Sequence, residues 1–199
     1  RRGGPADEAS RDAIELAALI VLCTGITGAL AMPLKDVFEG LFENTIAVGI
    51  AFLLTGAWLW LTRKHQAASE TTGLAKVTLK IAILVAIAQF IAVTPGISRS
   101  GSTIGMALLL GLQRKKAAEF SFLISIPAIV GANLLLLKDG GLDAGAAAIA
   151  AGVISSFVMG LAALWLLVLL VRRGRFYYFS YYLFPLGLLV LAGSALGWL

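Results

Sequence analysis

Hydrophobic residues in this 199-residue chain fall in long blocks rather than in a strict alternation with polar ones. The blocks cover about 13–33, 42–62, 77–93, 103–112, 117–137, 144–171 and 177–198. A helix rises about 1.5 Å per residue, so about 20 apolar residues cross a hydrocarbon core of roughly 30 Å. Five blocks reach that length, whereas 77–93 is marginal and 103–112 is too short. The pattern predicts an all-α transmembrane bundle with about five full spans and one irregular region.

Composition agrees with a single membrane domain over residues 1–199. Hydrophobic residues make up 59% of the chain and charged residues only 14%, with a mean hydropathy of +0.93. A soluble domain carries about 25% charged residues, so this chain lacks the polar surface that water requires. The net charge of +5 fits basic cytoplasmic loops of a membrane protein, and we expect no nucleic-acid partner. The single cysteine excludes a disulfide within the chain.

The loop charges suggest how the chain crosses the membrane. Basic residues dominate the connections at 63–80, 113–116 and 172–175, whereas those at 35–43 and 138–143 are acidic or balanced. The positive-inside rule places the three basic loops in the cytoplasm. The chain must then leave that side near residue 80 and return to it by residue 113. Two full crossings satisfy this requirement, and so does a re-entrant hairpin over 80–112, which the short second block favours.

The break in this region is the stretch TPGISRSGST, residues 94–103. It contains five hydroxyl side chains, two glycines, one arginine and the helix-breaking pair Pro95-Gly96. Irregular backbone at membrane depth is tolerated only where it is buried in protein or lines a watery cavity. The stretch therefore predicts a polar cavity at the tip of the hairpin.

Arg99 is the only basic residue within an apolar block. A charged group at membrane depth is costly and marks a functional site by default. The alternative is a structural ion pair, but Glu15 and Glu119 lie near the ends of their blocks and neither is an obvious partner. An unpaired guanidinium matches the geometry of a phosphate group. The sequence thus predicts an oxyanion site at Arg99.

The residues around Arg99 suit an anion. Gly96 and Gly101 permit close backbone approach, and the half-helix that follows presents free N–H groups at its positive end. Each neighbouring hydroxyl has a plainer alternative, which is to bond a backbone carbonyl or to cap the half-helix. Gln89 faces either the cavity or the bundle interior. Ser121 and Ser125 share one helix face that is suited to contact the hairpin.

The run from Gln89 to Ala132 resembles the second signature region of the undecaprenyl-diphosphatase family, the bacitracin-resistance membrane phosphatases. The core P-G-x-S-R-S-x-x-T of that region is present here as Pro95, Gly96, Ser98, Arg99, Ser100 and Thr103. The pattern A-x-x-F-S-F-L-x-x-x-P follows from Ala117 to Pro127. The resemblance extends from about residue 13 to the end of the chain.

The resemblance implies a fold similar to an inverted repeat, in which two re-entrant hairpins face each other. This chain supplies the second hairpin. The family's other signature, a glutamate-rich hairpin with two glutamates, a serine pair and a histidine, has no counterpart in the sequence, and the resemblance implies that one hairpin and about one transmembrane helix of the family fold are missing from it. A divalent cation, Mg²⁺ or Ca²⁺, is implied by the family, with its ligands expected outside this chain.

The implied activity is hydrolysis of undecaprenyl diphosphate to undecaprenyl phosphate and inorganic phosphate, which recycles the lipid carrier for peptidoglycan and underlies bacitracin resistance. The expected catalytic residues are Ser98, Arg99, Ser100 and Thr103, and the expected substrate-binding residues are Gln89, Pro95, Gly96, Gly101 and Ser102. We expect a multi-pass protein of the bacterial inner (plasma) membrane whose active site opens to the outer side. Two rival functions are a polyprenyl-phosphate transporter or flippase and a truncated, non-catalytic half. The sequence does not decide between a monomer and a homodimer.

Overall fold

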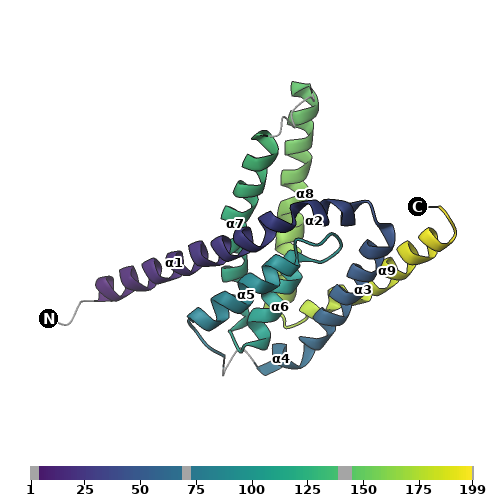
Figure 1. Cartoon of the computed structure of the whole chain (residues 1–199). Helices are drawn as coiled ribbons and strands as arrows, with labels where there is room; N and C mark the ends of the chain where they lie inside the picture. The colour runs from purple at the N-terminus through teal and green to yellow at the C-terminus, as the bar shows by residue number, and fades with distance from the viewer. Residues whose placement is uncertain (1–4, 69–72, 139–144, 199) are drawn as a thin grey trace.

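The structure is a computed structural model that describes residues 5–68, 73–138 and 145–198 (Figure 1). Every regular element within these ranges is helical, which confirms the predicted all-α class. The elements are α1 (Pro5–Ala31), η1 (Met32–Leu34), α2 (Lys35–Phe42), α3 (Thr45–Leu61), α4 (Arg63–Ala68), α5 (Leu79–Ile91), α6 (Arg99–Leu109), α7 (Arg114–Lys138), α8 (Ala146–Arg172), η2 (Phe176–Tyr178) and α9 (Phe179–Ala195).

Five helical stretches of the described chain are long and apolar enough to cross a membrane, as the hydrophobic blocks predict. They are Ser10–Phe42, Thr45–His65, Arg114–Leu135, Ala147–Arg172 and Phe176–Ala195. The first is longer than its block at 13–33, because η1 carries the chain from α1 into α2 at Met32 and Pro33 without a break. The next break comes at Asn44, whose side chain caps α3 by accepting a hydrogen bond from the Ala47 amide at 3.0 Å.

Helices α5 and α6 form a short hairpin. With 13 and 11 residues they are about 17 to 20 Å long, too short to cross a bilayer core of roughly 30 Å. The two ends of the hairpin meet, because the Leu74 amide donates to the Gly111 carbonyl at 2.8 Å and the Gln113 amide donates to the Leu74 carbonyl at 3.1 Å. The chain therefore enters and leaves this hairpin at one end, as a re-entrant element does.

Close helix packing surrounds the hairpin. Helices α3 and α9 run along each other, and a Cβ added at Gly49 or Gly187 would lie 2.8 Å from a leucine of the facing helix. Small residues permit such close approach in membrane bundles. On the other side of the hairpin, α1 bonds α5 through the Cys23 thiol, which donates to the Ala82 carbonyl at 3.0 Å, and through Thr27, which donates to the Ala86 carbonyl at 3.3 Å.

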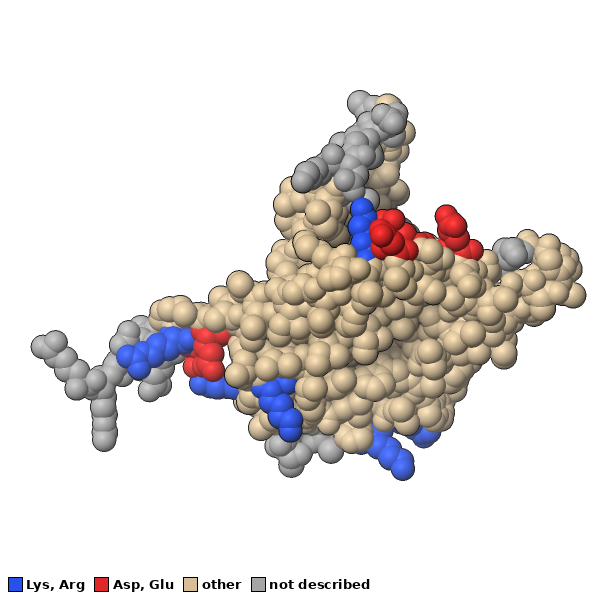
Figure 2. Space-filling view, in the orientation of Figure 1, with Lys and Arg blue, Asp and Glu red and all other residues tan. Residues whose placement is uncertain are grey.

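Helices α7 and α8 project together from the rest of the molecule (Figure 1). All the described residues of α8 from position 147 to position 166 are exposed, and burial begins only at Leu167. Charges lie at two edges of the body, with Lys and Arg mainly along the lower edge near α4 and Asp and Glu mainly at the upper edge near α2 (Figure 2). The basic connections and the acidic connections recognised in the sequence thus lie mainly at opposite edges of the body.

Candidate functional site

The turn between α5 and α6 is anchored by one hydroxyl of α3. Gly96 has a positive φ of 85°, a conformation that favours glycine, and its carbonyl accepts a hydrogen bond from Thr55 Oγ1 at 3.3 Å. The same Thr55 oxygen accepts from the Ser98 amide, also at 3.3 Å. Thr55 is 2% exposed and therefore fixes both sides of the turn from inside the bundle.

Ser98 caps the second helix of the hairpin. Its Oγ accepts a hydrogen bond from the Gly101 amide at 3.1 Å, so the capping alternative raised by the sequence is the one the structure adopts. The cap makes Arg99 the first residue of α6. The guanidinium is thereby attached at the positive end of a helix, where backbone N–H groups also favour an anion.

Arg99 lies half-buried beside a cavity of about 150 Å³. The cavity is lined by Arg99, Ser100, Ser121, Phe122, Ser125, Ala163, Leu164 and Leu167. One guanidinium nitrogen, Nη1, donates to the Ser125 carbonyl at 3.3 Å. Arg99 forms no ion pair with any carboxylate in the described parts of the chain. Since a guanidinium has five N–H donors, several remain for an anion in this cavity.

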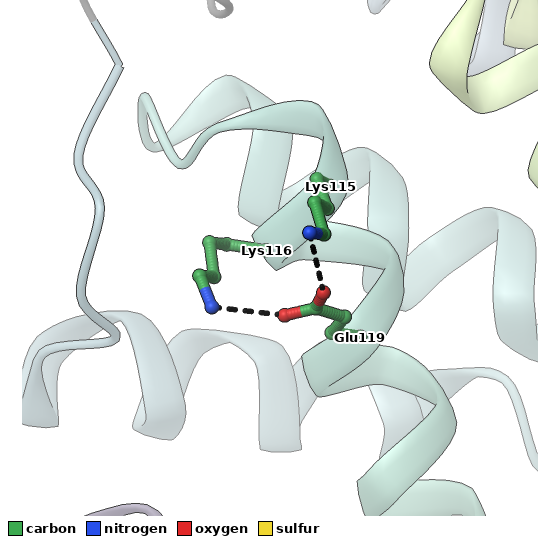
Figure 3. Close-up of polar contacts among 3 residues, drawn as sticks. All are labelled: Lys115, Lys116 and Glu119. Carbon is green, nitrogen blue, oxygen red and sulfur yellow. Dashed lines mark hydrogen bonds and ion pairs between the residues drawn. The ribbon is translucent and has the colours of Figure 1, made fainter. Parts of the chain in front are cut away.

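Glu119, in the first turns of α7, pairs with lysines of its own helix rather than with Arg99. The Lys115 and Lys116 ammonium groups both point at the Glu119 carboxylate, at 3.8 and 3.0 Å (Figure 3). These side chains are well exposed, so the pairs add little stability. The Glu119 carboxylate lies at the start of α7, and Glu119 is not among the residues that line the cavity.

Two serines predicted to face the hairpin do so. Ser121 Oγ hydrogen-bonds with Thr103 Oγ1, and Ser125 supplies the carbonyl that Arg99 contacts. Both serines also line the cavity. The pairing of α6 with α7 through these residues brings the A-x-x-F-S-F-L segment against the P-G-x-S-R-S segment, two patterns that are separate in the sequence.

Ser100 and the glycines of the tip have different places. Ser100 lines the cavity beside Arg99 and also a second cavity, which Ser98 and Gly101 share. Gly101 leaves room for the Ser98 cap, since a Cβ there would lie 3.0 Å from Ser98 Oγ. Pro95 is buried next to Gly96, where it shapes the turn.

Three other candidate residues lie away from both cavities. Thr103 is 1% exposed, and its hydroxyl donates to the Arg99 carbonyl at 2.9 Å in addition to its contact with Ser121. Ser102 is buried beside it. Gln89 is 2% exposed, and its amide donates to Thr27 Oγ1 at 3.1 Å, which is the bundle-facing alternative for this residue. The structure therefore gives Thr103 and Gln89 helix-packing contacts rather than places on a cavity wall.

The Thr103–Ser121 hydrogen bond gives a testable stability effect. Since it joins α6 to α7, the double replacement Thr103→Val with Ser121→Ala is expected to cost less than the sum of the two single replacements. We expect a coupling energy of about 0.5 to 1 kcal/mol, the range of hydrogen bonds between membrane helices. Unfolding of the four proteins in detergent micelles measures it, and strictly additive effects would contradict the assignment.

The residues present do not fit a divalent cation. The described residues contain no group of three or more His, Cys, Asp or Glu side chains close enough to hold a metal ion. The polar groups on the cavity wall are a guanidinium and neutral hydroxyls. Mg²⁺ and Ca²⁺ require carboxylate or carbonyl oxygens, and a fixed positive charge disfavours both. The cavity wall among the described residues is therefore suited to an anion and not to a cation.

Sequence reasoning missed Thr55 and the walls that α8, η2 and α9 contribute. Thr55 lies in the segment TGAWLWL, where its hydroxyl is a weak signal among small and aromatic residues. Leu167, Phe176 and Phe179 face the cavities but follow the same apolar pattern as residues that face lipid. Only the spatial arrangement separates these two groups.

Comparison with known proteins agrees with the motifs. The family model described as "Bacitracin resistance protein BacA" matches residues 2–189. A protein of Methanosphaera stadtmanae named undecaprenyl-diphosphatase is 42% identical over 87% of this chain and 62% of its own length. Proteins with the same name from Desulfosudis oleivorans and Methanothermobacter thermautotrophicus are 44% and 37% identical, with 68% and 99% of their own lengths covered. The chain thus spans about two thirds of the first and second of these relatives and nearly all of the third. This chain belongs to the bacitracin resistance protein BacA family.

Proposed function

We propose that this chain hydrolyses undecaprenyl diphosphate to undecaprenyl phosphate and inorganic phosphate. The observation that carries the proposal is the position of Arg99, at the start of α6, beside a hydroxyl-lined cavity and without a carboxylate partner among the described residues. A diphosphate supplies the negative charge that this site lacks. The name of its relatives and its membership of the family support the same activity.

The proposed mechanism depends on the negative charge that develops on the phosphate oxygens during hydrolysis. Water attacks the terminal phosphorus and gives up a proton to the solvent, the bridging P–O bond breaks, and undecaprenyl phosphate leaves with the bridging oxygen and its electron pair. Arg99 binds the diphosphate and stabilises charge on the oxygens in the transition state. The N–H groups at the start of α6 and the Ser100 hydroxyl hold the remaining oxygens. Thr103 and Ser121 position α6 against α7, so that Arg99 keeps its place.

A transporter or flippase for a polyprenyl phosphate is the second candidate. It is favoured by the short hairpin α5–α6, since transporters bind substrates at broken helices whose N-terminal ends point at anions. Both candidates share the anion site and differ only in bond cleavage. A truncated, non-catalytic half would also bind without cleaving.

Phosphate release separates these functions. The purified chain, in detergent with undecaprenyl diphosphate, is expected to release inorganic phosphate, measured by a colorimetric assay against a boiled sample. Binding of the lipid without any phosphate release would overturn the proposed hydrolysis. A transport assay in vesicles would then distinguish a flippase from a non-catalytic half.

We infer that the basic edge of the molecule faces the cytoplasm, following the positive-inside rule. The opening of the site to the outer side stays a prediction, and the depth of the cavities weighs against it. Leu59 lies two residues before the end of α3, and Leu167 lies five residues before the end of α8, both toward the basic loops. The cavities are thus nearer to the basic ends of these helices than to their opposite ends.

Cysteine labelling tests the orientation of the loops. Cysteines introduced at Lys64 and at Lys115 are expected to react with a membrane-impermeant maleimide from one side of sealed vesicles, and a cysteine at Glu39 from the other. All three positions are exposed, whereas the native Cys23 is 0% exposed and provides a low background. Labelling of positions 64 and 115 from opposite sides would exclude the re-entrant hairpin.

A further inference from the structure

A second cavity of about 190 Å³ adjoins the one beside Arg99. The two have Ser100 and Leu167 in common, so these two side chains lie between them. The second cavity is lined by Leu59, Ser98, Ser100, Gly101, Leu167, Phe176, Phe179, Tyr182 and Leu183. Its walls come from α3, α6, α8, η2 and α9.

The two cavities differ in chemistry. The first has a guanidinium and three serines on its wall, whereas the second has the hydroxyls of Ser98, Ser100 and Tyr182, with leucine, phenylalanine and one glycine elsewhere. Phe176 is 1% exposed and forms an inner wall. Tyr182 is 63% exposed on the outer surface of α9. The second cavity therefore runs from the interior of the bundle to its apolar surface, which is the arrangement a lipid chain requires.

The volume limits what fits. An apolar cavity of about 150 Å³ binds benzene, a six-carbon molecule. A cavity of about 190 Å³ is thus large enough for one branched five-carbon isoprene unit and too small for a folded chain. Aromatic and branched aliphatic walls also suit a branched, unsaturated unit by packing against it on several sides.

We propose that this cavity binds the isoprene unit next to the diphosphate of a polyprenyl diphosphate. The proposal rests on the proposed function for the charged end of the molecule. With the diphosphate at Arg99, the ester oxygen lies near Ser100 and the first isoprene unit passes Leu167 into the second cavity. The rest of the chain leaves past Tyr182 into the bilayer, between α8 and the η2–α9 segment. Phe179 and Tyr182 become specificity-determining residues.

Photocrosslinking tests the position of the chain. The probe is a polyprenyl diphosphate that carries a diazirine on its first isoprene unit, added to the full chain in detergent and mapped by mass spectrometry. We expect adducts on residues 176–183, reduced by excess undecaprenyl diphosphate and not by the same amount of phosphatidylglycerol. Adducts elsewhere, or equal competition by both lipids, would overturn the proposal, the second outcome indicating a non-selective lipid groove.

Phosphate release in the same preparation separates this proposal from the proposed function. Competed adducts at residues 176–183 without phosphate release would remove hydrolysis and leave the isoprenoid site standing. Phosphate release with adducts elsewhere would remove only the isoprenoid site. Each result therefore bears on one proposal alone.

A pair of neighbouring tyrosines provides matched variants. Tyr182 lines the cavity, whereas Tyr181, 57% exposed on the same helix, belongs instead to an aromatic cluster with Trp60 and Tyr177. Tyr182→Ala is expected to weaken competition by undecaprenyl diphosphate by about three- to tenfold, the effect of losing one apolar contact. Competition by inorganic pyrophosphate, which has no chain, should not change. Equal effects of Tyr182→Ala and Tyr181→Ala would contradict the proposal.

Discussion

Replacing Arg99 with alanine is expected to reduce phosphate release from undecaprenyl diphosphate by at least about 100-fold, with most of the loss in kcat. Removing a single preorganised donor from a developing oxyanion costs about 10²- to 10³-fold, and arginines that stabilise transferring phosphoryl groups contribute more. Arg99 is the only cation on the wall of either cavity among the described residues. No neighbouring side chain can therefore take over its charge.

The same replacement should leave the fold intact, which distinguishes catalysis from structure. Arg99 has a single side-chain hydrogen bond, at 3.3 Å, and no ion pair in the part of the chain that the structure describes. Thermal unfolding of Arg99→Ala in detergent is thus expected to match that of the wild type. Arg99→Lys keeps the charge but loses the bidentate geometry of the guanidinium. Its rate of phosphate release should therefore fall between those of the wild type and Arg99→Ala. Arg173→Ala, at an exposed loop position, is the matched control. Full activity of Arg99→Ala would refute the assigned role.

Much of the hairpin could be predicted from the sequence because two strong constraints act on it. The positive-inside rule places the basic loops on one side of the membrane, and the blocks around residues 94–103 are too short to span it. The structure shows a short hairpin that is closed at one end, since the Leu74 amide bonds the Gly111 carbonyl and the Gln113 amide bonds the Leu74 carbonyl. Charge placement and helix length are properties of the chain alone, and they need no knowledge of packing.

The roles of individual hydroxyls could not be predicted in the same way. Ser98, Ser100 and Thr103 have one chemistry in the sequence but three different places in the structure. Ser98 caps α6, Ser100 lines both cavities, and Thr103 is buried between α6 and α7. A hydroxyl in a helix bonds a carbonyl, a cap partner or a ligand with similar energies, so the neighbouring helices decide which contact forms.

The apolar walls of the site were equally hidden. In a soluble protein the buried face of a helix is apolar and the exposed face is polar, so the sequence distinguishes them. In a membrane helix both faces are apolar, and the sequence does not. Leu167 in α8 and Phe179 in α9 face the cavities, while similar residues of the same helices are exposed. A cavity wall of this kind becomes visible only when the helices are placed together.

The conformation of the turn sets the second large effect. Gly96→Ala is expected to lower the free energy of unfolding by about 2 to 5 kcal/mol and to reduce phosphate release with it. A side chain at a positive φ costs about 1 to 2 kcal/mol, and forcing atoms into a packed interior costs about 1 to 3 kcal/mol more. A Cβ at Gly96 would lie 2.7 Å from the Val48 carbonyl oxygen and 2.8 Å from Ala51 Cβ. Both atoms belong to α3, which also holds the turn through Thr55.

Gly111 makes the comparison decisive, because it shares the backbone strain without the crowding. Its φ is 84°, against 85° at Gly96, yet an added Cβ at Gly111 would meet nothing within 4 Å. Gly111→Ala should therefore cost only the conformational part, about 1 to 2 kcal/mol, and leave phosphate release near the wild-type rate. Denaturant unfolding of both variants in micelles measures the difference. If the two replacements cost the same, close packing of the turn against α3 contributes nothing, and α3 holds the turn through the Thr55 hydrogen bonds instead.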